Sequence, residues 1–156
     1  MKKVAFFVLL SGVLLVFSNC KKDNEDSNPT YYLTAKVNGE DFSGGILTGT
    51  QVGPFIIVIG IEGLGLGNSL SLSIEESLTP GTYPFDILNT DEVAGGYGNQ
   101  LPGGVVVNAE SGSMTITELD TVARIVSGTF EFSGADANSG ENYDITEGEF
   151  NVNYEQ

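Results

Sequence analysis

The segment of this chain that is best equipped for chemistry is a run of oxygen-bearing side chains in residues 136–147. Its candidate ligands stand at positions 1, 3, 9 and 12 of a twelve-residue loop, and they are Asp136, Asn138, Asp144 and Glu147. A hard cation such as Ca²⁺ uses oxygen ligands at this spacing. The order Gly140-Glu141 reverses the usual ligand and glycine of such a loop. The pattern therefore indicates either a calcium site or a polar hairpin loop, and no other cofactor is expected.

Paired carboxylates are the second chemistry to consider, because the chain has no histidine and Cys20 is its only cysteine. Two carboxyl groups can hydrolyse a glycoside, one as acid and one as base or nucleophile. The available sets are Glu75-Glu76, Asp91-Glu92 and Glu147 with Glu149. Neighbours in a strand point to opposite faces, so only Glu147 and Glu149 can share one, barring a bulge between them. With 21 acidic residues such pairs arise by chance, and we expect no enzyme.

Aromatic stacking is the third candidate chemistry. Residues 89–104 form the longest stretch without a periodic pattern, and long loops in compact domains are often functional. Tyr97 stands between two glycines in this stretch and is a candidate ligand contact at the tip of the loop. The chain has no tryptophan, so a glycan platform would have to come from Tyr83, Tyr97 or Tyr143.

The elements that must position these residues begin after an export signal. Lys2 and Lys3 precede an apolar run over residues 4–17, and Cys20 follows it. The run is shorter than the roughly 20 residues that a membrane-spanning helix requires, so residues 1–19 are predicted to be a signal peptide.

The segment from Leu14 to Cys20, Leu-Leu-Val-Phe-Ser-Asn-Cys, resembles the lipobox of bacterial lipoproteins. The resemblance implies that the chain is cut before Cys20 and that this residue is acylated, so that the lipid holds the protein on a membrane. Residues 20–29 are polar and end at Pro29, which is typical of a flexible tether. Lys21-Lys22 followed by acidic residues is similar to the signal that sends lipoproteins of Bacteroidota to the outer face of the outer membrane.

Residues 30–156 are predicted to form one all-β domain. The chain holds 21 glycines, and short runs with alternating apolar residues recur between Gly, Asn, Asp and Pro. We expect an antiparallel β-sandwich or flattened barrel of about nine or ten strands. The formal net charge of −15 excludes nucleic acid as a partner, because phosphates would be repelled.

Several strands can be placed from their pattern alone. Residues 31–37 alternate, and Asn38-Gly39 after them favours a two-residue hairpin turn. Residues 55–61 are apolar at every position except Gly60, which predicts a central strand covered on both faces. A strand is expected over residues 122–132 with Val122 on its buried face. Between Ile145 and Phe150 the buried face changes parity, which predicts a β-bulge at Glu147-Gly148.

Four motifs together are similar to those of small β-rich lipoproteins of Bacteroidota from families of unknown function. They are residues 35–42 (AKVNGEDF), 112–117 (GSMTIT), 125–132 (IVSGTFEF) and 145–152 (ITEGEFNV). The resemblance covers both ends of the domain, and it implies a location and a fold class without a catalytic residue.

The function expected from these features is non-catalytic. We predict a lipid-anchored protein, exposed at the cell surface, with a role in binding or assembly; its partners would be other outer-membrane proteins or surface glycans. A lipocalin-like carrier of a small apolar ligand is the main alternative, and it requires a connected apolar cavity of several hundred Å³. A calcium-binding or glycan-binding module is the other.

Overall fold

The computed structural model describes residues 30–63, 67–88, 90–99 and 101–156. The predicted signal peptide and the whole tether, including Cys20, lie outside these ranges. The described residues contain eleven strands and no helix, and the strands form two antiparallel sheets that are not closed into a barrel. The prediction of an all-β sandwich or flattened barrel is therefore confirmed, and the fold is the sandwich, with eleven strands where about nine or ten were expected.

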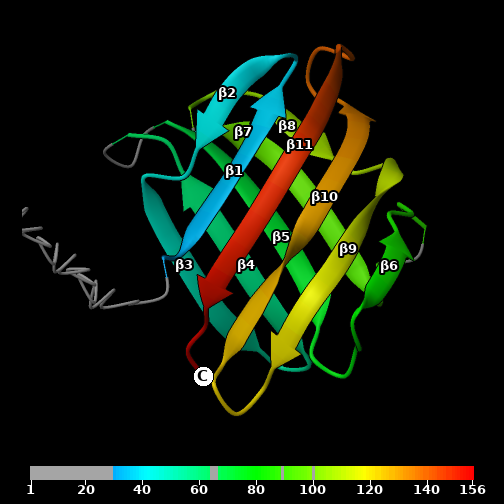
Figure 1. Ribbon diagram of the computed structural model, residues 1–156. Helices are drawn as coiled ribbons and strands as arrows, with labels where there is room; N and C mark the ends of the chain where they lie inside the picture. The colour runs from blue at the N-terminus through cyan, green and yellow to red at the C-terminus, as the bar shows by residue number, and fades with distance from the viewer. Residues whose placement is uncertain (1–29, 64–66, 89, 100) are drawn as a thin grey trace, which may run out of the picture.

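The two sheets lie face to face, and their strands cross one another in Figure 1. The six-stranded sheet has the order β2 (Glu40–Ser43), β1 (Tyr32–Val37), β11 (Asn142–Asn153), β10 (Ile125–Ala135), β9 (Ser111–Asp120) and β6 (Gly81–Pro84). The five-stranded sheet has the order β3 (Ile46–Val52), β4 (Phe55–Ile61), β5 (Asn68–Glu75), β7 (Val93–Asn99) and β8 (Val106–Asn108).

One apolar core fills the space between the sheets, because every long strand turns alternate residues inward. In β5 these are Leu70, Leu72 and Ile74, each at most 1% exposed. From the six-stranded sheet they include Ile116, Phe130 and Phe150. Burial of these side chains is the main favourable contribution to folding.

Two local predictions are confirmed. Asn38 and Gly39 have φ values of +49° and +85° and join β1 to β2, as a two-residue hairpin turn requires. The register of β11 shifts against both β10 and β1 between Ile145 and Glu149, and Glu147 has a φ of +50°. This is the predicted bulge, and it returns Phe150 and Val152 to the core.

Two predictions about chain regions are wrong. Residues 93–99 of the expected loop form strand β7, paired with both β5 and β8. Three of its seven residues are glycines, which have no side chain to alternate, so the sequence of β7 shows no period of two. In the structure, the absence of a side chain at Gly95 lets the ring of Phe132 pack against the backbone. Val122 lies in the turn between β9 and β10 and is 93% exposed, so it is not part of the buried face.

Short backbone contacts join the sheets at two corners. At one corner the Glu155 amide donates to Gly49 O and the Gln51 amide donates to Glu155 O, at 3.1 and 2.7 Å. The chain end therefore covers part of the free edge of β3. At the other corner Asp136 forms an antiparallel bridge with Val107 of β8. Each contact leaves fewer unpaired backbone groups at an edge strand.

Candidate functional site

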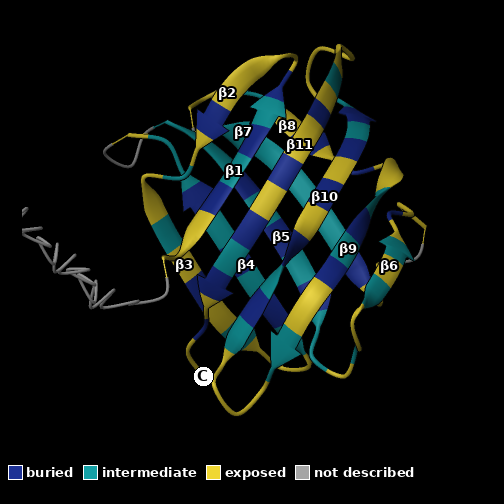
Figure 2. Ribbon diagram, viewed as in Figure 1, coloured by how far each residue is buried: buried dark blue, intermediate teal, exposed yellow. Residues whose placement is uncertain are grey.

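Strand β4 presents apolar side chains on both faces of the five-stranded sheet. Ile56 and Val58 point into the core and are fully buried, whereas Phe55, Ile57, Ile59 and Ile61 point outward and are partly exposed (Figure 2). The strand lies inside its sheet as predicted, but the prediction that both of its faces are covered is wrong. The described residues form two layers, so nothing in them covers the outer face of β4.

The exposed apolar surface continues onto the edge strand β3. Ile46 pairs with Ile61, and Val52 pairs with Phe55. The side chains of Ile46 and Val52 are 43% and 60% exposed. We call the resulting row of outward side chains the apolar ridge. Its members are Ile46, Val52, Phe55, Ile57, Ile59 and Ile61.

A shallow hollow lies beside the ridge on the same face. The outward residues of β5 at the hollow are serines, and Ser69 and Ser71 pair with Gly98 and Gly96 of β7. A methyl group on Gly98 would collide with Val105 O, so glycine is required where β7 meets the chain leading into β8. The hollow has a volume of about 220 Å³ and is bordered by Val106 and Asn108. We call it the serine–glycine hollow.

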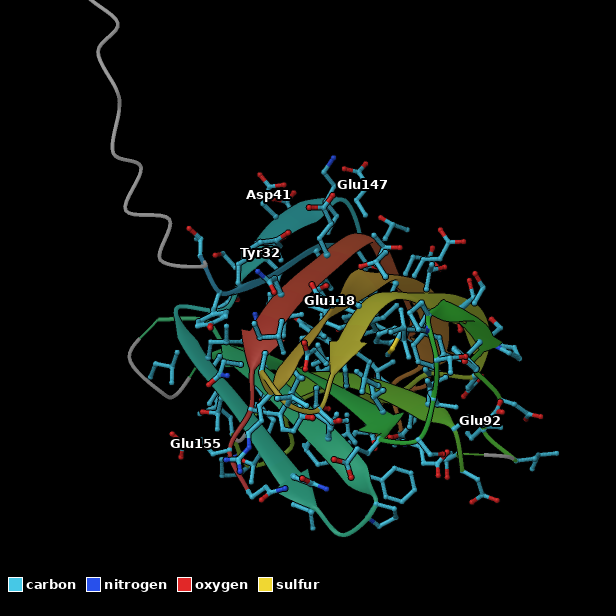
Figure 3. All side chains as sticks on the ribbon, turned by 60° about the horizontal axis from the view of Figure 1, so that its bottom comes forward. Tyr32, Asp41, Glu92, Glu118, Glu147 and Glu155 are labelled. Atoms are coloured by element: carbon cyan, nitrogen blue, oxygen red, sulfur yellow. The ribbon has the colours of Figure 1, made fainter. Side chains whose placement is uncertain are left out.

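The ridge and the hollow themselves contain no charged residue, although Glu75 of β5 lies beside Phe55 at the end of the ridge. The outer face of the six-stranded sheet is richer in carboxylates. A depression of about 400 Å³ on that face is lined by Glu131, Glu147 and Glu149 together with hydroxyl groups. Asp41, Glu118 and Glu147 are labelled in Figure 3, where Asp41 and Glu147 point away from the five-stranded sheet. The two outer faces of the sandwich therefore differ sharply in charge.

Asp136, the first predicted calcium ligand, is buried, and its carboxylate is bound by its own chain. One oxygen accepts hydrogen bonds from the amides of Val106 and Asn138 at 2.8 and 3.3 Å. The other accepts from the amide and the hydroxyl of Ser139 at 3.0 and 2.6 Å. These bonds, above all that from the Ser139 hydroxyl, lower the pKa of Asp136 to about 2. The carboxylate fixes the turn after β10 and ties it to β8.

The other three predicted ligands do not converge with Asp136. The Asn138 side-chain amide donates to Gly104 O at 2.5 Å, and Asp144 is exposed on β11. Glu147, in the bulge, forms an ion pair of 2.8 Å with Lys36 of β1. No group of three or more acidic, histidine or cysteine side chains in the described part of the chain could hold a metal ion.

The three tyrosines considered as a glycan platform all pack into the sandwich or bond their own chain. Tyr97 lies on β7 and not at a loop tip, and its ring contacts those of Phe42 and Tyr143 at centroid distances of 6.4 and 5.8 Å. Burial raises the pKa of Tyr97 above its ordinary value. The Tyr83 hydroxyl donates to Thr79 O at 2.7 Å. Tyr32, which the sequence patterns did not single out, is exposed beside a hollow on the six-stranded sheet.

The carboxylate pairs have ordinary structural partners. Glu75 accepts a hydrogen bond from the Ser77 hydroxyl, and Glu76 accepts one from the Gln51 side-chain amide, at 2.8 and 2.6 Å. Glu147 and Glu149 share one surface in spite of the bulge. The Lys36 ammonium group compensates the charge of Glu147 there. Asp91 and Glu92 lie exposed between β6 and β7.

The molecule is thus a small antiparallel β-sandwich with one outer face rich in carboxylates and an apolar ridge on the other. The chain belongs to the family described as a domain of unknown function, DUF6252, whose model matches residues 29–152. No curated protein and no solved structure matches it. In the described residues no helix has the length and apolarity needed to cross a membrane.

Proposed function

We propose that the chain is a non-catalytic protein, anchored by a lipid on Cys20 to the outer membrane and exposed at the cell surface, whose apolar outer face binds another macromolecule. The observation that carries the binding role is the apolar ridge on β3 and β4. Monomeric soluble proteins rarely leave a contiguous apolar patch of more than a few hundred Å² in water, and such patches mark interaction sites.

The anchor is supported by the sequence from Leu14 to Cys20 and by the polar tether behind it. Two acyl chains already hold a protein stably on a bilayer, since each buried CH₂ contributes about 0.8 kcal/mol. The acidic six-stranded face fits the same role, because it keeps an anchored domain solvated while the other face is engaged.

A carrier of a small apolar ligand is supported less well. The space between the sheets is occupied by one cluster of buried side chains that includes Leu33, Ile74, Met114 and Phe150. A hollow of about 250 Å³ lies at one corner, next to Phe85 and Ala109, and it is lined by polar residues as well. Binding at the surface accounts for the exposed side chains of the apolar ridge, whereas a ligand carried between the sheets would not.

The test is made in intact cells with a photo-crosslinking amino acid at position 57 on the ridge or at position 129 on the six-stranded sheet. We expect ultraviolet light to produce protein adducts from position 57 and few from position 129. The Cys20→Ala variant should be recovered outside the membrane fraction, because it lacks the acylated residue. Equal adducts from both positions would contradict the binding face, and membrane retention of Cys20→Ala would contradict the anchor.

A further inference from the structure

The apolar ridge and the serine–glycine hollow lie side by side on one face, and we propose that this face binds the same face of a second copy of the chain. The ridge of each copy would occupy the hollow of the other. This inference rests on the proposed function, because it names the partner of the same binding face.

The geometry for such a contact is already present. Neighbouring strands are about 4.8 Å apart, so the ridge on β4 and the hollow over β5 and β7 form parallel features of one sheet. A two-fold axis that lies in the interface, parallel to the strands and between these features, places each ridge opposite a hollow. An interface of this kind uses one patch twice, as most homodimers do.

The serine hydroxyls in the hollow tolerate burial by apolar side chains. The Ser69 hydroxyl donates to Gly98 O at 3.2 Å, and the Ser71 hydroxyl donates to Gly96 O at 3.5 Å. Their donors are thus satisfied within the chain, and covering them with isoleucine leaves no orphaned hydrogen-bond donor. The backbone groups of Gly96 and Gly98 are paired with β5 and β8.

The size and charge of the face fit a weak dimer. A face about 23 Å long and about 20 Å wide, from seven-residue strands at the usual spacings, lets two copies bury on the order of 1,000 Å². That area is at the lower limit for a specific complex. The acidic residues described on the six-stranded sheet would face away from the interface, and Glu75, beside Phe55 at the end of β5, would lie at its rim. The remaining repulsion between two acidic domains is screened by salt, so dimerisation should strengthen as ionic strength rises.

The experiment uses the full, anchored protein in cells that produce two copies with different epitope tags. With the photo-crosslinker at position 57, we expect an adduct of twice the monomer mass that carries both tags. Ser71→Leu should reduce this adduct at least fivefold, because leucine fills the hollow that receives the ridge. Ser127→Leu on β10 is the matched control, and it should leave the yield unchanged. Thermal unfolding of both variants checks that they fold.

A positive charge introduced on the ridge separates the contribution of apolar burial from that of electrostatic repulsion. Ile59→Lys adds a positive charge to an acidic domain and so reduces repulsion, yet it should abolish the two-tag adduct because lysine resists burial. Thr129→Lys is its control. An increase of the adduct in Ser71→Leu would overturn the packing of ridge into hollow. Adducts with other proteins or with lipid alone would overturn the dimer, and those with other proteins would leave the proposed binding face intact. Absence of any adduct would overturn both.

Discussion

Asp136 illustrates how far residue types alone define a role. Its spacing from Asn138, Asp144 and Glu147 indicated an oxygen-rich loop, and the loop is indeed polar. What the spacing could not predict is that both oxygens of Asp136 accept hydrogen bonds from within three residues and from Val106 across the sandwich. The bond from Val106 depends on the position of β8 next to this turn, and a local sequence pattern does not contain that information.

We expect Asp136→Asn to lower the unfolding temperature at neutral pH, because an amide nitrogen cannot accept the bonds from Ser139. The pKa of Asp136 is lowered from 3.8 to about 2 in the folded protein. The stability that the carboxylate contributes is therefore present above about pH 4 and lost as the pH falls towards 2. Thermal unfolding followed by circular dichroism should show this acid dependence weakened in Asp136→Asn.

Asp144→Asn is the control for that measurement, since Asp144 is exposed on β11. Its acid dependence should match the unmodified protein. Equal acid profiles for Asp136→Asn and the unmodified protein would show that the turn does not depend on this carboxylate.

At the scale of strands, the pattern succeeded wherever side chains alternate. The bulge at Glu147-Gly148 was predictable because Ile145 and Phe150 could not both face the core without an extra residue. Strand β7 was missed because Gly95, Gly96 and Gly98 have no side chains to show a period. In β4 the apolar residues were noticed, but a run that is apolar on both faces does not say whether a second layer covers it.

Gly148→Ala tests the bulge. A methyl group at this position would lie 2.5 Å from Phe130 O and 2.6 Å from the Phe130 ring. Such overpacking typically costs about 1 to 3 kcal/mol, and we expect a loss of that order in the free energy of unfolding measured in urea. Gly45→Ala is the control, because the nearest atoms to its added methyl are 3.7 Å away. Equal midpoints for the two variants would contradict the tight fit at Gly148.

At the scale of the whole molecule, the antiparallel all-β architecture follows from composition and alternation. The choice of a sandwich over a flattened barrel and the order of strands within the two sheets do not. Within the six-stranded sheet, β1 pairs with β11, which lies far from it in the sequence. The difference in charge between the outer faces also appears only in the fold. It arises because β10 and β11 contribute outward carboxylates while the outward residues of β3 and β4 are apolar or neutral.

Deletion of residues 155–156 tests the corner formed by the chain end. The truncated chain loses the two backbone hydrogen bonds to Gly49 and Gln51, and we expect it to lose about 1 to 3 kcal/mol of stability. Hydrogen exchange at the Gln51 amide should accelerate. Glu155→Ala keeps the backbone bonds and should behave like the unmodified protein. Unchanged exchange at Gln51 in the truncated chain would contradict a role of this corner in protecting β3.

The pairing of the first strand with the last also sets the order of events during synthesis. The six-stranded sheet cannot be completed until residues near 150 have emerged, and long-range pairings of this kind form slowly. A chain synthesised only as far as β10 lacks the strand that pairs with β1. The free edge of β1 therefore has no partner until β11 is available, and the sheet closes only then.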